Sequence, residues 1–467
     1  MLLFISILIP VLLGNTLLVL IFSRQKQVKK QKYNFIEFLC WSYGLGAGLV
    51  TFSMFILVLL KVPFSLLNFN LVIISLLVLG FIFIIVNKKN IPKFFLPQIK
   101  ISRLTFLELI LILVILFEIG FVFSEALSRP IFVFDTLTNW AFKAKIFFFE
   151  ESNVFNPLSP LSLAGASHLN YPLHGPFLMA WVYLWLGEIN ETSVNLIFAF
   201  YFLSLLGLIY FSLRHFVPRK ISLIFTMFLS TMPLFNYHGF NAYVDLPFTF
   251  YFTGAVIFLF RYFKEKDSPC LILAGLWAGL ASLTKNEGLM LSVVLLIVFG
   301  IYLIREKKIK TEFKNFLFFI FYFLFLTLPW IIFKIIFHLG YSNVDTGKVF
   351  LNQFHPEIFD QVFRQIFLAN SFHLWPGIFL LIFLIKWRQV KVNYNFYLFF
   401  IILITLAAYF VLYLFTSSYQ FMIDGTAFCR NMMVLIPTSI FLAALLVKDQ
   451  KTPDLPLPSL RVLLSLK

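Results

Sequence analysis

Residues 134–145 read Phe-Asp-Thr-Leu-Thr-Asn-Trp-Ala-Phe-Lys-Ala-Lys, and residues 170–176 read Asn-Tyr-Pro-Leu-His-Gly-Pro. Both segments lie in the interval 124–176, the longest part of the chain without an apolar run of membrane-spanning length. Asp135 is followed by Trp140, Lys143 and Lys145, at spacings that suit a short amphipathic helix lying on a membrane surface. Polar residues kept between membrane spans are more often functional than not. We therefore expect this interval to carry the functional face of the protein.

The composition outside this interval is that of a membrane protein. Of the 467 residues, 61% are hydrophobic and only 12% are charged, whereas a soluble domain has about a quarter charged residues. A spanning helix needs about 20 apolar residues, and such runs recur along the chain. We predict an all-α polytopic membrane protein with about thirteen transmembrane helices. The expected spans are 2–22, 35–60, 69–86, 104–124, 192–214, 221–236, 247–262, 270–284, 288–304, 316–337, 373–387, 396–416 and 431–447.

The net charge of +16 follows the positive-inside rule. Lys and Arg gather in short loops between the expected spans, which indicates cytoplasmic loops rather than a nucleic-acid surface. We expect no nucleic-acid partner. The basic loops are 24–32, 87–103, 261–266, 305–314 and 386–391. The three cysteines, Cys40, Cys270 and Cys429, are far apart and predict neither a disulfide framework nor a zinc site.

The apolar run from Phe177 to Leu186 is an exception to the span pattern. It is short, lies between Pro176 and Gly187, and would invert the orientation of every later loop if it crossed the membrane. The basic loop at 305–310 would then lie outside, against the charge rule. We interpret the run as a helix at the membrane edge.

With this orientation, the unusual polar residues fall on the extracytoplasmic side, and each also has a structural interpretation. Asp135 and Asp245 could cap helices, and Lys285 with Glu287 could form an interfacial ion pair. Arg430 opens an apolar run, where a cation opposes the helix dipole, which favours an anionic partner. His174 fits a hydrogen-bonded loop histidine, and the group from His355 through Glu357 and Asp360 to Arg364 fits a solvated face. A transporter would place such residues near mid-membrane in broken helices.

The order of these residues carries a family resemblance. Asp135 is followed by Tyr171-Pro172 before a short apolar helix, then by Tyr-x-Asp-x-Pro at 243–247, Leu-Thr-Lys-x-Glu-Gly at 283–288 and a late Arg430. The set resembles the GT-C superfamily of integral-membrane glycosyltransferases. Within it, the chain is similar to the dolichyl-phosphate-mannose protein mannosyltransferases and to the related bacterial enzymes that modify lipopolysaccharide. The resemblance covers roughly residues 104–445.

Two departures from the family pattern affect the substrate subclass and any metal requirement. The family often has paired acids in the first outer loop, whereas Asp135 stands alone. The usual Tyr-Pro-Pro or His-Pro-Pro is replaced here by Tyr171-Pro172-Leu173.

The resemblance implies an inverting glycosyltransferase that takes a hexose or pentose from a polyprenyl-phosphate donor. The acceptor would be a glycan, a lipid or a protein. Asp135 is expected to act as the general base, and Lys285 and Arg430 are expected to bind the donor phosphate. Asp245 would orient the acceptor or, together with Asp135, hold a divalent cation such as Mg²⁺ or Mn²⁺. The residues expected to support the site are Glu287, Trp140, Lys143, Tyr171, His174 and Tyr243.

We divide the chain into additional N-terminal spans (1–103), a glycosyltransferase membrane domain (104–447, with a catalytic loop at 124–176) and a cytoplasmic tail (448–467). The expected location is a bacterial inner membrane, with the active site facing outward. Two alternatives stay open, a transporter or flippase of lipid-linked saccharides and a polymerase or ligase of such saccharides. A scaffold protein would leave the ordered polar set unexplained.

Overall fold

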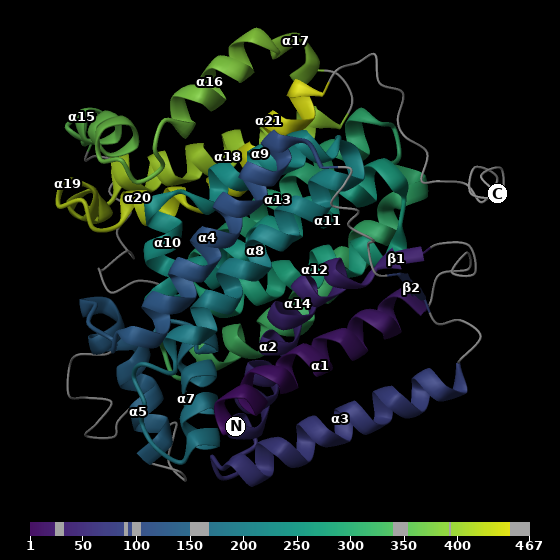
Figure 1. Cartoon of the computed structure of the whole chain (residues 1–467), viewed down its shortest axis with the longest axis vertical. Helices are drawn as coiled ribbons and strands as arrows, with labels where there is room; N and C mark the ends of the chain where they lie inside the picture. The colour runs from purple at the N-terminus through teal and green to yellow at the C-terminus, as the bar shows by residue number, and fades with distance from the viewer. Residues whose placement is uncertain are drawn as a thin grey trace.

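The computed structural model describes residues 1–23, 32–87, 92–95, 104–149, 168–339, 354–391 and 394–448. Most of the predicted cytoplasmic tail and the centre of the predicted catalytic loop lie outside these ranges. The described part is built almost entirely of helices (Figure 1).

Nine helices in the described ranges are long and apolar enough to cross a membrane, which confirms the all-α polytopic class. They are α1 (Leu2–Ser23), α2 (Phe35–Leu59), α3 (Leu66–Val86), α4 (Phe106–Ser128), α8 (Asn195–Phe216), α11 (Asp245–Glu265), α13 (Glu287–Arg305), α14 (Ile309–Ile336) and α18 (Asn395–Phe415). Three shorter apolar helices are α12 (Ser268–Thr284), α16 (Trp375–Ile385) and α21 (Leu435–Val447). The predicted number of thirteen spans is therefore not confirmed.

The expected span 221–236 is wrong as a single helix. Residues 221–236 fall into α9 (Arg219–Ser230) and α10 (Pro233–Phe240), which are separated by Thr231 and Met232. The break occurs because Pro233 has no backbone N–H to continue the α9 ladder, and proline is favoured in the first turn of a new helix. The backbone N–H of Leu234 instead donates to the carbonyl oxygen of Ser371 at 3.3 Å.

The remaining elements are short. They are β1 (Lys32–Asn34), β2 (Lys93–Phe95), η4 (Thr136–Trp140), α5 (Ala141–Phe149), α7 (His174–Leu186), α15 (Ile358–Phe363), η5 (Arg364–Leu368), α17 (Trp387–Val390), η6 (Ser417–Tyr419), α19 (Gln420–Ile423) and α20 (Phe428–Met432). The strands β1 and β2 pair in parallel. Helix α7 ends at Leu186 and is followed by Gly187, which has a positive φ of 73°.

The start of α8 lies beside the end of α4, because Asn195 donates to the carbonyl oxygen of Arg129 at 2.9 Å. The chain has therefore returned to the same end of the bundle after α7. A helix of 13 residues at about 1.5 Å per residue is also shorter than the hydrocarbon core. This geometry agrees with the interpretation of residues 177–186 as a helix at the membrane edge.

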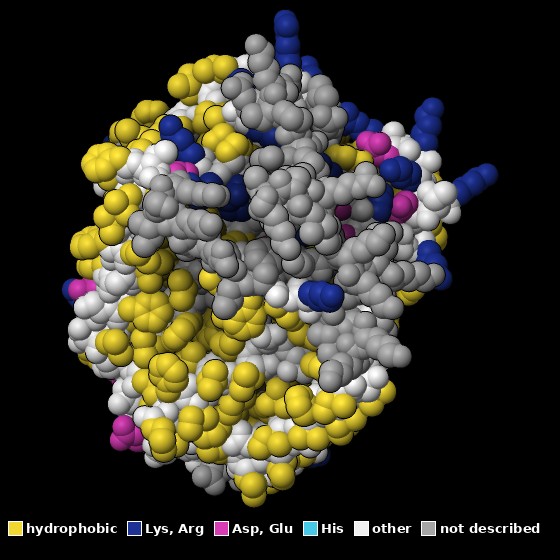
Figure 2. All heavy atoms as spheres, turned by 45° about the vertical axis from the view of Figure 1, so that its right-hand side comes forward, with side chains coloured by type: hydrophobic (Ala, Val, Ile, Leu, Met, Phe, Trp, Pro, Cys, Tyr) yellow, Lys and Arg dark blue, Asp and Glu magenta, His cyan; other side chains and the backbone are white. Residues whose placement is uncertain are grey.

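Polar contacts join helices at the end of the bundle where α4 begins and α13 ends. At this end, Arg219 makes two hydrogen bonds of 2.8 Å to Glu108, and Tyr397 donates to Glu306 at 2.6 Å. This end contains the strand pair, at the right of Figure 1. Figure 2 looks at it obliquely and shows Lys and Arg side chains in its upper and right-hand parts, with a broad apolar surface below them.

Helix α11 forms the centre of the bundle and joins its two ends. The apolar part of α11 that is long enough to cross a membrane is completely buried inside the protein. Only 17% of the corresponding parts of α3 and α4 is buried. Apolar helix faces that are exposed to this extent are expected to contact lipid. Because α11 begins at Asp245, the core helix carries a carboxylate directly to the end of the bundle opposite the strand pair.

Helices α1 and α2 pack closely against each other. A Cβ atom at Gly14 would lie 1.9 Å from the carbonyl oxygen of Ser42, and one at Gly46 would lie 1.7 Å from that of Pro10. Helix α2 in turn contacts α7, α8 and α11. The boundary predicted at residue 103 stays a prediction, but the N-terminal helices are packed into the rest of the bundle.

Candidate active site

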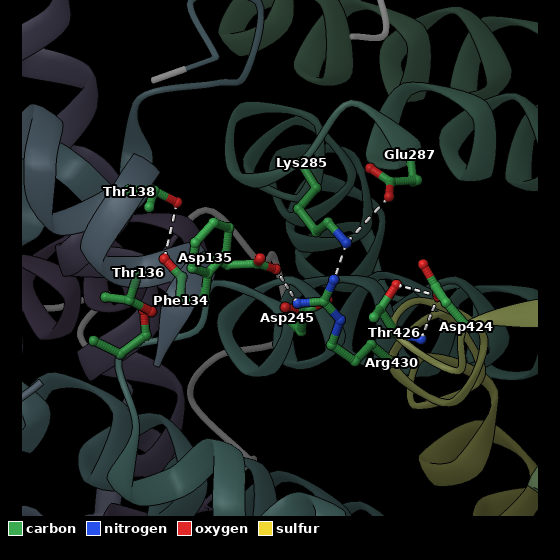
Figure 3. A network of polar contacts seen from close by, with 11 residues as sticks. Phe134, Asp135, Thr136, Thr138, Asp245, Lys285, Glu287, Asp424, Thr426 and Arg430 are labelled. Atoms are coloured by element: carbon green, nitrogen blue, oxygen red, sulfur yellow. Dashed lines mark hydrogen bonds and ion pairs between the residues drawn. The ribbon is translucent and has the colours of Figure 1, made fainter. Parts of the chain in front are cut away.

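Asp135 lies at the start of η4, shortly after α4 ends (Figure 3). The neighbouring Thr136 is completely buried and donates its hydroxyl to the carbonyl oxygen of Ala242 at 3.0 Å. This bond ties the first outer loop to the turn before α11, so that Asp135 and Asp245 come to the same region. The Asp135 side chain is 40% exposed, which leaves its carboxylate open to solutes.

Arg430 in α20 approaches Asp135 from the C-terminal part of the chain. Its guanidinium forms an ion pair with the Asp135 carboxylate, and its Cζ lies 5.2 Å from the centre of the Tyr243 ring. Burial opposes the charge, but the carboxylates of Asp245 and Asp135 raise the pKa of Arg430 above its ordinary value. The anionic partner that we expected for Arg430 is therefore Asp135 in this structure.

Lys285 occupies the junction between α12 and α13. Its Nζ lies 2.9 Å from Asp245 and 3.1 Å from Glu287, and the residue is 8% exposed. Burial acts to lower the pKa of Lys285, but these two carboxylates outweigh it and raise the pKa above its ordinary value. Lys285 thus lies between two acids that favour its charged form.

The helix junction is tight because residue 288 is glycine. A Cβ atom at Gly288 would lie 2.3 Å from the carbonyl oxygen of Ala281 in α12. The absence of a side chain lets α13 start directly against the end of α12. Lys285 and Glu287 are consequently held next to the first residue of α11, at the end of the bundle opposite the strand pair.

Two supporting residues of the first outer loop pack together. The Trp140 and Tyr171 rings meet edge to face, with centroids 5.2 Å apart. Burial raises the pKa of Tyr171 to about 12. Lys143 is buried and donates to the carbonyl oxygen of His168. Burial lowers the pKa of Lys143 to about 7. Lys143 therefore anchors the two parts of the loop to each other.

His174 is not brought to this cluster. Its Nδ1 lies 2.7 Å from the hydroxyl of Thr51 in α2, and its Nε2 lies 2.9 Å from the hydroxyl of Tyr201 in α8. The imidazole is buried and joins three helices through hydrogen bonds. The group from His355 to Arg364 is also separate, since Asp360 and Arg364 pair with each other at 2.6 Å with both side chains more than half exposed.

The structure adds residues that the sequence did not suggest. Asn286 donates to the carbonyl oxygen of Asn170 at 3.1 Å, and its own Oδ1 accepts from Lys334 of α14 at 3.2 Å. An amide between Lys285 and Glu287 was a possible signal, because three consecutive polar residues join two apolar helices. Lys334 gave no signal in the sequence, because a lysine near the end of an apolar helix usually extends its ammonium group to the membrane surface.

The carboxylates at the site face cations. Among the residues that the structure describes, no group of three or more His, Cys, Asp or Glu side chains is placed to hold a metal ion. Asp135 pairs with Arg430, and Asp245 pairs with Lys285. The metal site that we expected at Asp135 and Asp245 stays a prediction.

Comparisons with known proteins agree with the family resemblance. A model of the dolichyl-phosphate-mannose-protein mannosyltransferase family matches residues 170–333. This segment includes Tyr171, Asp245, Lys285 and Glu287, whereas Asp135 and Arg430 lie outside it. A comparison with curated protein sequences finds no match.

Two solved structures share the fold. They are crystal structures of ArnT from Cupriavidus metallidurans, one in the apo state and one bound to undecaprenyl phosphate. Their TM-scores are 0.53 and 0.52, at 13% and 14% sequence identity. Each match covers 72% of this chain and 59% of the ArnT chain. The predicted resemblance is thus confirmed, and the chain is a multi-pass integral membrane protein with a GT-C fold.

Proposed function

We propose that the protein is an inverting glycosyltransferase that takes a sugar from a polyprenyl-phosphate donor. The observation that carries this proposal is the convergence of Asp135, Arg430, Asp245 and Lys285 at one end of the bundle. A partly exposed acid next to fixed cations suits a reaction in which a hydroxyl loses a proton while a phosphate leaves. The family match and the undecaprenyl phosphate bound to ArnT support this donor class.

In the proposed reaction, an acceptor hydroxyl oxygen attacks the anomeric carbon as the bond from that carbon to the phosphate oxygen breaks. Asp135 accepts the hydroxyl proton as general base. Negative charge develops on the departing polyprenyl phosphate, and Arg430 and Lys285 stabilise it. Attack opposite to the leaving phosphate inverts the configuration at the anomeric carbon.

The ion pair between Asp135 and Arg430 suggests the order in which the two substrates bind. While the guanidinium of Arg430 holds the Asp135 carboxylate in an ion pair, that carboxylate is occupied and cannot take the proton of an acceptor hydroxyl. The donor phosphate is a competing anion for Arg430. Binding of the donor would therefore release Asp135 from Arg430 and make it available to the acceptor, so we propose that the donor binds first.

The proposed location follows from the charge pattern. If the basic loops are cytoplasmic, the end that holds Asp135, Lys285 and Arg430 faces away from the cytoplasm. A polyprenyl donor would reach this end with its tail in the bilayer and its phosphate at the interface. We propose the inner membrane of a bacterium, with residues 104–447 as the transferase domain and a glycan, lipid or protein as the acceptor.

The proposal is tested by sugar transfer in membranes. Radiolabelled polyprenyl-phosphate sugars would be supplied to membranes containing the wild type or Asp135→Asn, and label in lipid, glycan and protein fractions would be counted. We expect transfer by the wild type and a loss of about 100-fold or more in the variant, which is the usual contribution of a positioned base. Equal transfer by both proteins would remove Asp135 from the mechanism. Movement of labelled lipid between leaflets without transfer would establish a flippase instead.

A further inference from the structure

A short helical segment outside the membrane-length helices carries a row of exposed aromatic rings. The segment consists of α15 and η5, which together cover residues 358–368. Phe359, Phe363 and Phe367 follow one another at intervals of four residues and therefore lie on one side of it. They are 52%, 56% and 44% exposed. Single exposed hydrophobic residues are ordinary on a protein surface, whereas a continuous row of them indicates an interaction surface.

The other two sides of the segment have a different character. Ile358 and Gln365 are buried, and Gln365 donates to the carbonyl oxygen of Met422 in α19 at 2.6 Å. Asp360 and Arg364 each follow an exposed phenylalanine by one position, and they form the solvent-exposed ion pair described above. The segment thus has a buried side, an aromatic side and a charged side. Helices of this composition lie in a membrane interface with their charges toward water.

Contacts with α18 fix the depth of the segment. The backbone N–H of His355 donates to the carbonyl oxygen of Leu414 at 3.1 Å, and the ring of Phe359 stacks on that of Phe410 with centroids 6.4 Å apart. Leu414 lies in the last turn of α18, whose 21 residues are about 30 Å long and so match the hydrocarbon core. The segment therefore lies where α18 leaves that core. Figure 1 shows α15 and α19 at the left, away from the strand pair.

The aromatic row continues the surface by which α18 faces lipid. Only 28% of the apolar, membrane-length part of α18 is buried. Val411 directly follows Phe410, which stacks on the segment, and it is 52% exposed. A protein partner would have to displace lipid from α18 to cover the adjoining rings. Lipid is therefore the partner that fits this surface.

The segment also supports the helix that carries Arg430. Cys429 in α20 donates its thiol to the carbonyl oxygen of Gln365 at 3.5 Å. Arg430 is the next residue in the chain, and its guanidinium pairs with Asp135. The position of the segment relative to the membrane therefore also sets the position of this part of the candidate site.

We propose that α15 and η5 form an interfacial segment at the end of the bundle opposite the strand pair, with the rings of Phe359, Phe363 and Phe367 among the lipid chains. The charged side of the segment faces water. Arg430 is consequently held at the depth of the lipid head groups. The inference rests on the membrane-spanning character of α18 and is independent of the proposed function.

The test measures which solvent surrounds each side of the segment. Full-length Phe363→Cys and Arg364→Cys proteins would be labelled with a nitroxide and reconstituted in vesicles of phosphatidylethanolamine and phosphatidylglycerol. Power saturation in electron paramagnetic resonance would compare the access of oxygen, which partitions into lipid, with that of a water-soluble nickel chelate. We expect the ratio of oxygen to nickel access to be several-fold higher at position 363 than at position 364. The two residues are matched, because they are neighbours with similar exposed fractions, 56% and 62%.

Two controls calibrate the measurement. Val411→Cys gives the ratio for a lipid-facing position of α18, and the unsubstituted protein gives the background from its three cysteines, which are buried or half-buried. Preferential access of nickel at both 363 and 364 would overturn the proposal, because the whole segment would then lie in water. Poor access of both reagents at 363 would overturn it in favour of a protein partner. A preference for oxygen at both positions would overturn it as well, because the segment would then lie within the hydrocarbon.

Discussion

The contact between Asp245 and Lys285 allows a quantitative prediction. The two side chains are only 5% and 10% exposed and lie 2.9 Å apart. Removing one partner of a buried ion pair leaves an uncompensated charge and costs about 3–5 kcal/mol. Lys285→Met should therefore destabilise the protein by about this amount. Its effect should lie at the upper end, because Glu287 loses its cation as well.

Removing both partners should cost much less than the sum of the single changes. In the double variant Asp245→Asn/Lys285→Met, Glu287 is the remaining acid, and it is 22% exposed, so water compensates part of its charge. We expect a coupling energy of about 2 kcal/mol, within the range for contacting residues. The measurement is a double-mutant cycle in which unfolding is followed by circular dichroism during titration with denaturing detergent.

The control cycle uses Lys145→Met and Glu191→Gln. These residues also form an ion pair, but their side chains are about 30% exposed, and such pairs contribute less than about 1 kcal/mol. Additive effects of the Asp245 and Lys285 changes would refute the argument that burial makes this pair strong. A coupling energy between Lys145 and Glu191 as large as that between Asp245 and Lys285 would refute the same argument.

Three further predictions concern charge and pH. Because burial lowers the pKa of Lys143 from 10.5 to about 7, the unfolded chain binds more protons between these values. The stability of the wild type should rise with pH in this window, and Lys143→Met should lose that rise in thermal unfolding scans. Arg430→Lys should reduce transfer by about tenfold or more, because a lysine cannot reproduce the guanidinium geometry; unchanged steady-state rates would contradict this. If Asp135 and Asp245 hold a divalent cation, chelation should abolish transfer and Mg²⁺ or Mn²⁺ should restore it, whereas full activity in EDTA would exclude a required metal.

Much of the arrangement at the polar end could be predicted from the sequence. In a chain of apolar spans, Asp135, Asp245, Lys285 and Arg430 stand out because charges inside or beside a bilayer are costly. The positive-inside rule then assigns them to one side. What the sequence could not provide was the pairing of Asp135 with Arg430, since 295 positions separate them. That contact depends on tertiary packing.

Other features could not be predicted because composition does not distinguish their alternatives. His174 lies in a motif that the family resemblance marks, but its imidazole turns toward α2 and α8. Lys334 has the sequence context of a snorkelling lysine, and only the fold places it beside Asn286. The sequence did not reveal the break at Pro233, because the mean hydropathy of an apolar run changes little at a single proline.

The close packing of α1 against α2 bears on how the protein is made. These helices leave the ribosome before α7, α8 and α11, which later surround α2. During synthesis, α1 and α2 are therefore in the membrane before those partner helices are made. The contacts at Gly14 and Gly46 let the two backbones approach closely, and such approaches hold helices together in membranes where apolar burial gives no advantage. The pair can thus insert as a preformed hairpin, onto which the later helices of the chain assemble as they emerge.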